Sequence, residues 1–91
     1  MLRTRTLEYA HIDDICELFG LNMREFSFTD EQENGSFFYL PCNDHWMQDT
    51  IECIEDMEGT RYEAKYRNTL KLQNYVRNEM KQDGIEIYIA W

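Results

Sequence analysis

The last seven residues, IEIYIAW (85–91), constrain the fold more than any other stretch, because they form one nearly continuous apolar run. Such a run, rich in β-branched residues, predicts a strand that is buried inside a sheet. Alternate residues of a strand share one face, so its odd-numbered apolar side chains must cover a core. We therefore expect a central strand here, entered through a turn at Asp83-Gly84.

Two elements are expected before residue 21. Residues 2–8 alternate Thr with Arg or Leu, which is compatible with a first strand. Within 11–20, apolar side chains recur at the i, i+3, i+4 and i+7 spacing of an amphipathic helix, and three acidic residues face away from them. Gly20 supplies the usual helix stop.

The middle of the chain predicts an antiparallel hairpin. Aromatic and polar residues alternate at 26–28, and an aromatic run follows at 37–40. The pair Asn34-Gly35 between them is a strong signal for a type I′ turn, although a helical turn starting at Thr29 is an alternative. The tip of this hairpin is acidic and should lie in solvent; it carries Asp30, Glu31 and Glu33.

A helix is expected from Asn43, a good N-cap, to about Glu58. On a helical wheel its apolar residues, Trp46 among them, fall on one arc and its acidic residues on the opposite arc, with almost no mixing. Gly59 then fits the left-handed position that ends a helix.

A second helix is expected from the capping box Thr60-x-x-Glu63 to about Gln82, although one continuous helix through Gly59 is the alternative. Its expected inner face consists of Tyr62, Tyr66, Thr69, Leu70, Gln73, Val76 and Met80. Tyr75 falls on the outer side, where an exposed aromatic ring could anchor a partner protein.

These elements give the order βαββααβ and predict an α+β fold for residues 1–91 as a single domain. We expect a three- or four-stranded, mostly antiparallel sheet with helices packed on one face. With 91 residues and 43% hydrophobic residues the chain can bury one modest core, as a monomer or small homo-oligomer. It has neither an 18-residue apolar run nor an apolar secretory leader, and an odd set of three cysteines suits reduced thiols. We therefore expect no membrane association and a cytoplasmic location.

Charge is the most informative global property. The chain has 18 acidic and 9 basic residues, a net charge of −9, which disfavours direct binding to nucleic acid. Residues 25–60 contain ten carboxylates and no Lys or Arg, whereas residues 61–91 carry six basic and four acidic groups. Lys65 and Arg77 of the later segment could reach across a helical hairpin to the acidic helix. An excess of negative charge must nevertheless remain on one side of the molecule.

No catalytic or cofactor motif is present. Cys42-x-x-His45 with Cys53 is the best candidate for a zinc site, but His45 and Cys53 lie about 12 Å apart along one helix axis and point to different faces. A row of carboxylates on a convex helix face also lacks the concave, partly dry site that acid/base catalysis needs. We therefore expect no metal, no cofactor and no enzymatic activity.

The acidic surface leads to a functional hypothesis: a small inhibitor that docks on a basic, nucleic-acid-binding groove of a partner protein by mimicking nucleic acid. The chain resembles the small acidic anti-CRISPR and anti-restriction proteins of bacteriophages in size and charge, and the resemblance rests on no motif. It implies a location in the host cytoplasm. The expected contact residues are Asp30, Glu31, Glu33, Asp44, Asp49, Glu52, Glu55, Asp56 and Tyr75. The alternatives are a cytosolic adaptor or subunit that is acidic for solubility, and a small enzyme with an unrecognised site.

Overall fold

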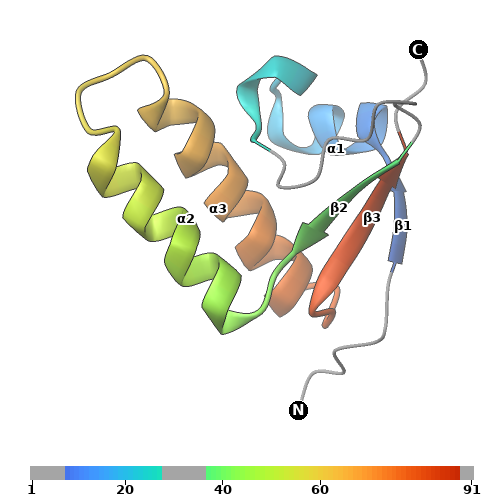
Figure 1. The fold of residues 1–91 in the computed structure, drawn as a ribbon. Coiled ribbons are helices and arrows are strands. Elements are labelled where there is room, and N and C mark those ends of the chain that lie inside the picture. Colours follow the sequence, from blue (N-terminus) through green and yellow to red (C-terminus); the bar gives the residue numbers. More distant parts are fainter. Residues whose placement is uncertain (1–7, 28–36, 89–91) are drawn as a thin grey trace.

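The computed structural model describes residues 8–27 and 37–88, and Figure 1 shows their arrangement. Three helices and three strands are present in this part of the chain, together with one short 3-10 helix, η1. Their bounds are β1 Glu8–His11, α1 Ile12–Phe19, η1 Met23–Glu25, β2 Phe37–Pro41, α2 Asp44–Asp56, α3 Glu63–Asn78 and β3 Gly84–Tyr88. The prediction of a small α+β domain is confirmed.

The three strands form one sheet in the order β1-β3-β2, so the central position predicted for the last strand is confirmed. β2 pairs with β3 in antiparallel fashion, with Leu40 opposite Ile85 and Phe38 opposite Ile87. β1 pairs with the other edge of β3 in parallel. The sheet is therefore mixed, with one pairing of each kind.

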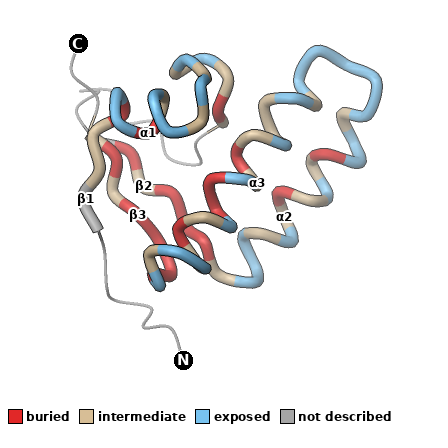
Figure 2. The backbone as a smooth tube through the Cα atoms, turned by 180° about the vertical axis from the view of Figure 1, so that it is seen from behind, coloured by how far each residue is buried: buried red, intermediate tan, exposed pale blue. Residues whose placement is uncertain are grey.

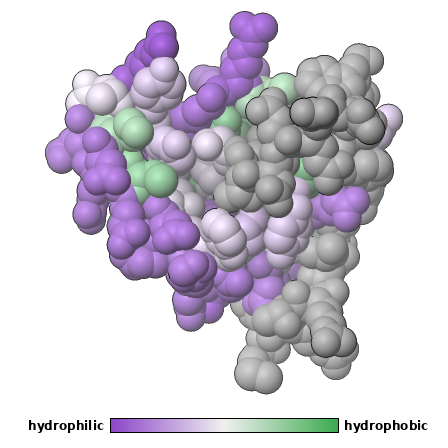
Figure 3. Space-filling view, viewed as in Figure 1, coloured by the Kyte–Doolittle hydropathy of each residue, from purple (hydrophilic) through white to green (hydrophobic). Residues whose placement is uncertain are grey.

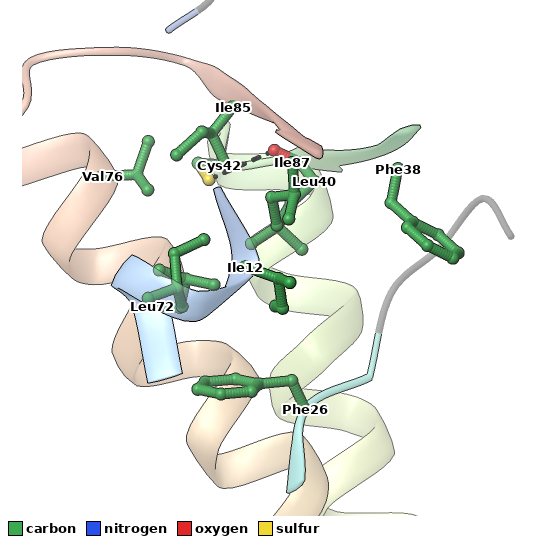
Figure 4. Close-up of a cluster of buried hydrophobic side chains, with 10 residues drawn as sticks. Ile12, Phe26, Phe38, Leu40, Cys42, Leu72, Val76, Ile85 and Ile87 are labelled. Atoms are coloured by element: carbon green, nitrogen blue, oxygen red, sulfur yellow. Dashed lines mark hydrogen bonds between the residues drawn. The ribbon is translucent and has the colours of Figure 1, made fainter. Parts of the chain in front are cut away.

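The core lies on one face of this sheet, between the strands and helices α1 and α3 (Figures 2 and 4). Alternate residues of β3 point into it, and Ile85 and Ile87 are almost completely buried. Leu72 and Val76 reach the same core from α3. Helix α2 packs on α3 and forms the outermost layer in Figure 1.

Helix α1 begins and ends where the sequence predicts. His11 is its N-cap, and the Nδ1 atom of this residue accepts a hydrogen bond from the backbone N–H of Asp13 at 3.2 Å. Gly20 ends the helix with φ at 66°, in the left-handed region that glycine adopts without strain. Ile12 and Ile15 are buried, which confirms the apolar face.

The prediction of a strand at 26–28 is wrong for the part that the structure describes. Residues 23–25, directly before this stretch, form η1, because Asn22 and Glu25 make a capping box. Asn22 Oδ1 accepts from the N–H of Arg24, and Glu25 Oε2 accepts from the N–H of Asn22 at 2.7 Å. Phe26 follows this turn and is buried in the core without being part of a strand. The predicted hairpin turn and Phe28 lie outside the described residues.

The turn between α2 and α3 confirms two helices rather than one, and Gly59 adopts a positive φ of 80°. The predicted capping box is wrong, because α3 begins at Glu63 and the side chain of its N-cap, Tyr62, makes no hydrogen bond to the first turn of the helix. Glu63 Oε1 accepts from the N–H of Gly59 at 2.9 Å, one residue before the position expected. Thr60 is used within the turn, where its hydroxyl donates to the carbonyl of Met57.

The inner face of α3 is partly as predicted. Thr69, Gln73 and Val76 are buried, and so is Leu72, which the sequence analysis did not select. Tyr62 is 43% exposed because it precedes the helix. None of the helices in the described part of the chain has the length and apolar character needed to cross a bilayer.

Candidate functional site

Helix α2 positions most of the acidic residues that the sequence analysis selects. Asn43 caps the helix: its Oδ1 atom accepts a hydrogen bond from the N–H of Trp46 at 3.0 Å. The buried residues of α2 are Thr50 and Ile54. Since buried residues occupy one face of the helix, its carboxylates lie on the remaining faces, and Figure 3 shows a largely hydrophilic surface over this region.

A groove of about 410 Å³ runs between α2 and α3, and three of the predicted carboxylates line it: Asp49, Glu52 and Asp56. Their spacing of i, i+3 and i+7 places them in a row that rises by about 10 Å along the helix axis. The other lining residues are Ser27, Trp46, Thr50, Cys53, Tyr66, Thr69 and Gln73. Acidic side chains thus border a hollow whose walls also contain aromatic rings and hydroxyls.

The expectation of a purely convex acidic face is therefore wrong. Sequence reasoning assigned Trp46 and Tyr66 to the apolar faces of their helices, whereas Trp46 is 38% exposed and both rings line the groove. The available signal was the pair of small residues, Thr50 and Cys53, on the same side of α2. Both short side chains line the groove between α2 and α3.

The floor of the groove contains buried polar groups. The Nε2 atom of Gln73 donates to the carbonyl of Pro41 at 3.0 Å, while its Oε1 atom has no hydrogen-bond partner among the described residues. The hydroxyl of Thr69 accepts from the N–H of Ser27 at 2.7 Å and joins the segment after η1 to α3. The segment that contains Ser27 therefore closes one side of the groove.

One predicted carboxylate already has an ion-pair partner within the protein. Asp44, at the start of α2, forms an ion pair with Arg77 of α3, as the sequence analysis expected for this cation. The hydrogen bond from the guanidinium, followed by its charge, holds the pKa of the Asp44 carboxyl below its usual value. Asp44 is therefore less available to a partner than the carboxylates that line the groove.

The other carboxylates of α2 have few internal partners. Asp49 lies 3.7 Å from the Nε2 atom of His45, one turn earlier. Glu52, Glu55 and Asp56 take part in none of the ion pairs formed among the described residues. Glu55 is exposed but does not line the groove.

The remaining predicted contact residues do not join this cluster. Tyr75 is half-buried, and its ring packs edge-to-face on Phe19 of α1 with the centroids 6.0 Å apart. Its ring therefore helps to hold α1 on α3, and the prediction of an outward-facing aromatic anchor is not what the structure shows. The acidic tip, Asp30, Glu31 and Glu33, lies outside the described residues.

The cysteines are free thiols in three separate environments. Burial raises the pKa of Cys53, and the neighbouring charges of Asp56, Asp49 and Glu52 raise it further, so this thiol stays protonated in the groove. Cys42 is completely buried, its pKa is raised to about 12 mainly by burial, and its Sγ atom donates to the carbonyl of Leu40 (Figure 4). Residues 8–27 and 37–88 contain no group of three or more His, Cys, Asp or Glu side chains placed to hold a metal ion.

No protein-family model, curated protein or solved structure matches this chain. Its function must therefore be argued from the groove and the charges around it.

Proposed function

We propose that this protein is a small acidic inhibitor that docks on a basic, nucleic-acid-binding surface of a partner protein. The supporting observation is that three of the five carboxylates of α2 line one groove and are left largely unpaired. Asp49, Glu52 and Asp56 line the groove, and the last two form no ion pair with any described residue.

The cost of this arrangement argues against a purely structural role. Like charges three or four residues apart on a helix each destabilise it by about 0.2–0.5 kcal/mol. Glu52 has three such neighbours, Asp49, Glu55 and Asp56, and none of them is offset by a cation on α2, which contains no Lys or Arg. The same charges become favourable when a basic partner approaches.

The groove adds selectivity to this charge. A Lys or Arg side chain from the partner could place its cationic head among the rim carboxylates and its methylene stem on the walls. Trp46 and Tyr66 provide aromatic surface there, and cations bind well over such rings. A row of carboxylates would thereby occupy the positions that phosphates take on the basic surface. The protein itself would not bind nucleic acid, and it would act in the cytoplasm, the host cytoplasm if it is encoded by a phage.

The test is a pull-down from a nuclease-treated bacterial lysate with two variants of equal net charge. The groove variant carries Asp49→Asn, Glu52→Gln and Asp56→Asn. The control variant neutralises three carboxylates of α1 instead, with Asp13→Asn, Asp14→Asn and Glu17→Gln.

We expect the wild-type protein and the control variant to capture the same nucleic-acid-binding protein, and the groove variant to lose it. A partner that both variants retain equally would contradict docking through α2. Capture only of proteins that do not bind nucleic acid, through contacts insensitive to salt, would favour the adaptor alternative.

A further inference from the structure

A second hollow, of about 310 Å³, lies where η1 meets the start of α3, and it gathers positive charge. Its lining includes Arg24, Glu25, Arg61, Tyr62, Lys65 and Asn68. Three of these residues are cations and one is a carboxylate, a balance of +2 in a chain whose net charge is −9. Such a concentration of cations needs an explanation in so acidic a protein.

The cations of this hollow form no ion pairs with other described residues. None of the ion pairs among the described residues includes Arg24, Arg61 or Lys65. The nearby carboxylates are occupied elsewhere: Glu25 accepts from the N–H of Asn22 at 2.7 Å, and Glu63 accepts from Arg67 Nε at 2.7 Å. The positive charge of the hollow is therefore left for an external anion.

Arg61 is already held in place. Its guanidinium carbon lies 4.9 Å from the ring centroid of Tyr62, and its Nη2 atom donates to the hydroxyl of the same tyrosine at 2.6 Å. A guanidinium that is fixed in this way loses less side-chain entropy on binding. Its remaining N–H groups can form the charge-assisted, bidentate hydrogen bonds that phosphate oxygens accept well.

The start of α3 reinforces these cations. Tyr62 is the N-cap and offers no side-chain hydrogen bond to the first turn, and Ala64 of that turn also lines the hollow. Free backbone N–H groups and the helix dipole favour negative charge at this end. Thr60 accepts from the N–H of Tyr62 through its hydroxyl and from the N–H of Glu63 through its carbonyl, which leaves the N–H groups of Ala64 and Lys65 to face an anion.

We propose that the hollow binds a phosphate dianion, either inorganic phosphate or a phosphomonoester, through Arg61, Lys65 and Arg24. The volume lies at the small end of ligand sites, which span roughly 300–1,000 Å³. The local balance of +2 matches a dianion, whereas a phosphodiester carries a single charge at each phosphate. This site is separate from the acidic groove and does not depend on the proposed inhibitor function.

The test is a titration of the ¹⁵N-labelled protein with sodium phosphate, followed by NMR at about pH 7.5, where a phosphomonoester is mostly a dianion. Ionic strength is kept constant by replacing sodium chloride. We expect saturable shifts of the backbone amides of Ala64, Lys65 and Asn68. Absence of saturable shifts at these amides would overturn the proposal.

Variants test the residues assigned. Arg61→Gln combined with Lys65→Gln should weaken binding by about tenfold or more, because two charge-assisted contacts are lost. Glu25→Gln keeps an oxygen that can cap η1 and removes the opposing charge, so it should tighten binding. Lys71→Gln, an exposed cation on α3 outside the hollow, should change nothing. Binding that the double variant retains, with its fold checked by circular dichroism, would contradict the assignment.

Two further ligands distinguish the sources of phosphate. O-phosphoserine should bind at least as tightly as inorganic phosphate, and a short single-stranded oligonucleotide should bind at least about tenfold more weakly per phosphate, because a diester offers fewer charged oxygens. An oligonucleotide that binds this hollow as tightly per phosphate as O-phosphoserine would overturn the preference for a dianion.

Discussion

Glu52→Gln should stabilise the protein, which is unusual for a substitution in a helix. Glu52 has like-charged neighbours at i−3, i+3 and i+4, namely Asp49, Glu55 and Asp56, and no ion-pair partner among the described residues. Removing three repulsions of about 0.2–0.5 kcal/mol each should raise the free energy of unfolding by about 0.6–1.5 kcal/mol at low salt. Gln and Glu have similar helix propensities, so the charge is the main change.

The assay is urea unfolding followed by circular dichroism, at low salt and at about 1 M sodium chloride. With m values of about 1–3 kcal/mol/M, the midpoint should rise by roughly 0.2–1.5 M at low salt. At high salt the gain should largely disappear, because the screening length falls to about 3 Å, which is shorter than the distance between these side chains.

Glu63→Gln is the matched control, since it removes a carboxylate that does have partners. Glu63 accepts hydrogen bonds from Arg67 and from the N–H of Gly59, so its neutralisation should destabilise the protein. A loss of stability in Glu52→Gln, or a gain that does not respond to salt, would refute the view that repulsion among the carboxylates of α2 destabilises the folded protein.

Other consequences follow from the core, the sheet and the ion pair. Leu72→Ala should lower the free energy of unfolding by about 2–5 kcal/mol, measured by urea unfolding, because Leu72 is 1% exposed in the core. Gly84→Ala should cost about 1–3 kcal/mol, seen as a lower melting temperature, since an added Cβ would lie 2.6 Å from the hydroxyl of Tyr39. Asp44→Asn should be less stable than the wild type near neutral pH: Arg77 lowers the pKa of the folded carboxyl, so its contribution is present above the unfolded pKa of about 3.9 and is lost as pH falls through the folded pKa. Unfolding curves from neutral to acidic pH should therefore converge for the two proteins.

The elements that the sequence predicts well carry their own boundary signals. α1 ends at a glycine, α2 begins at an asparagine cap, and β3 is apolar enough to require a central place in the sheet. Each of these features depends on residues that are close together in the chain.

The features that sequence reasoning missed depend on competition or on distant contacts. The capping box of η1 overrides the alternation that suggested a strand near Phe26, and the start of α3 moved because Glu63 bonds to Gly59 rather than to Thr60. The parallel pairing of β1 with β3 joins Glu8 to Ile85, residues at opposite ends of the chain. No local pattern specifies such a pairing.

One part of the candidate site is predictable from the local sequence, and another part depends on contacts between distant residues. The unpaired charge of α2 follows from composition and helical spacing. The groove does not, because its shape depends on how α2 lies against α3 and on Ser27, which is bonded to Thr69 across 42 positions of sequence. A helical wheel shows which side chains share a face but not whether a neighbouring helix makes that face concave.

Competition with nucleic acid tests the central claim most directly. The partner captured by the wild-type protein would be bound to a fluorescent oligonucleotide, and this protein would be added while the anisotropy of the oligonucleotide is followed. Nucleic-acid mimicry predicts complete displacement, with the groove variant of α2 at least about tenfold less effective because several contacts to charged groups are lost. A ternary complex, in which the partner holds this protein and the oligonucleotide together without loss of affinity for either, would contradict the account.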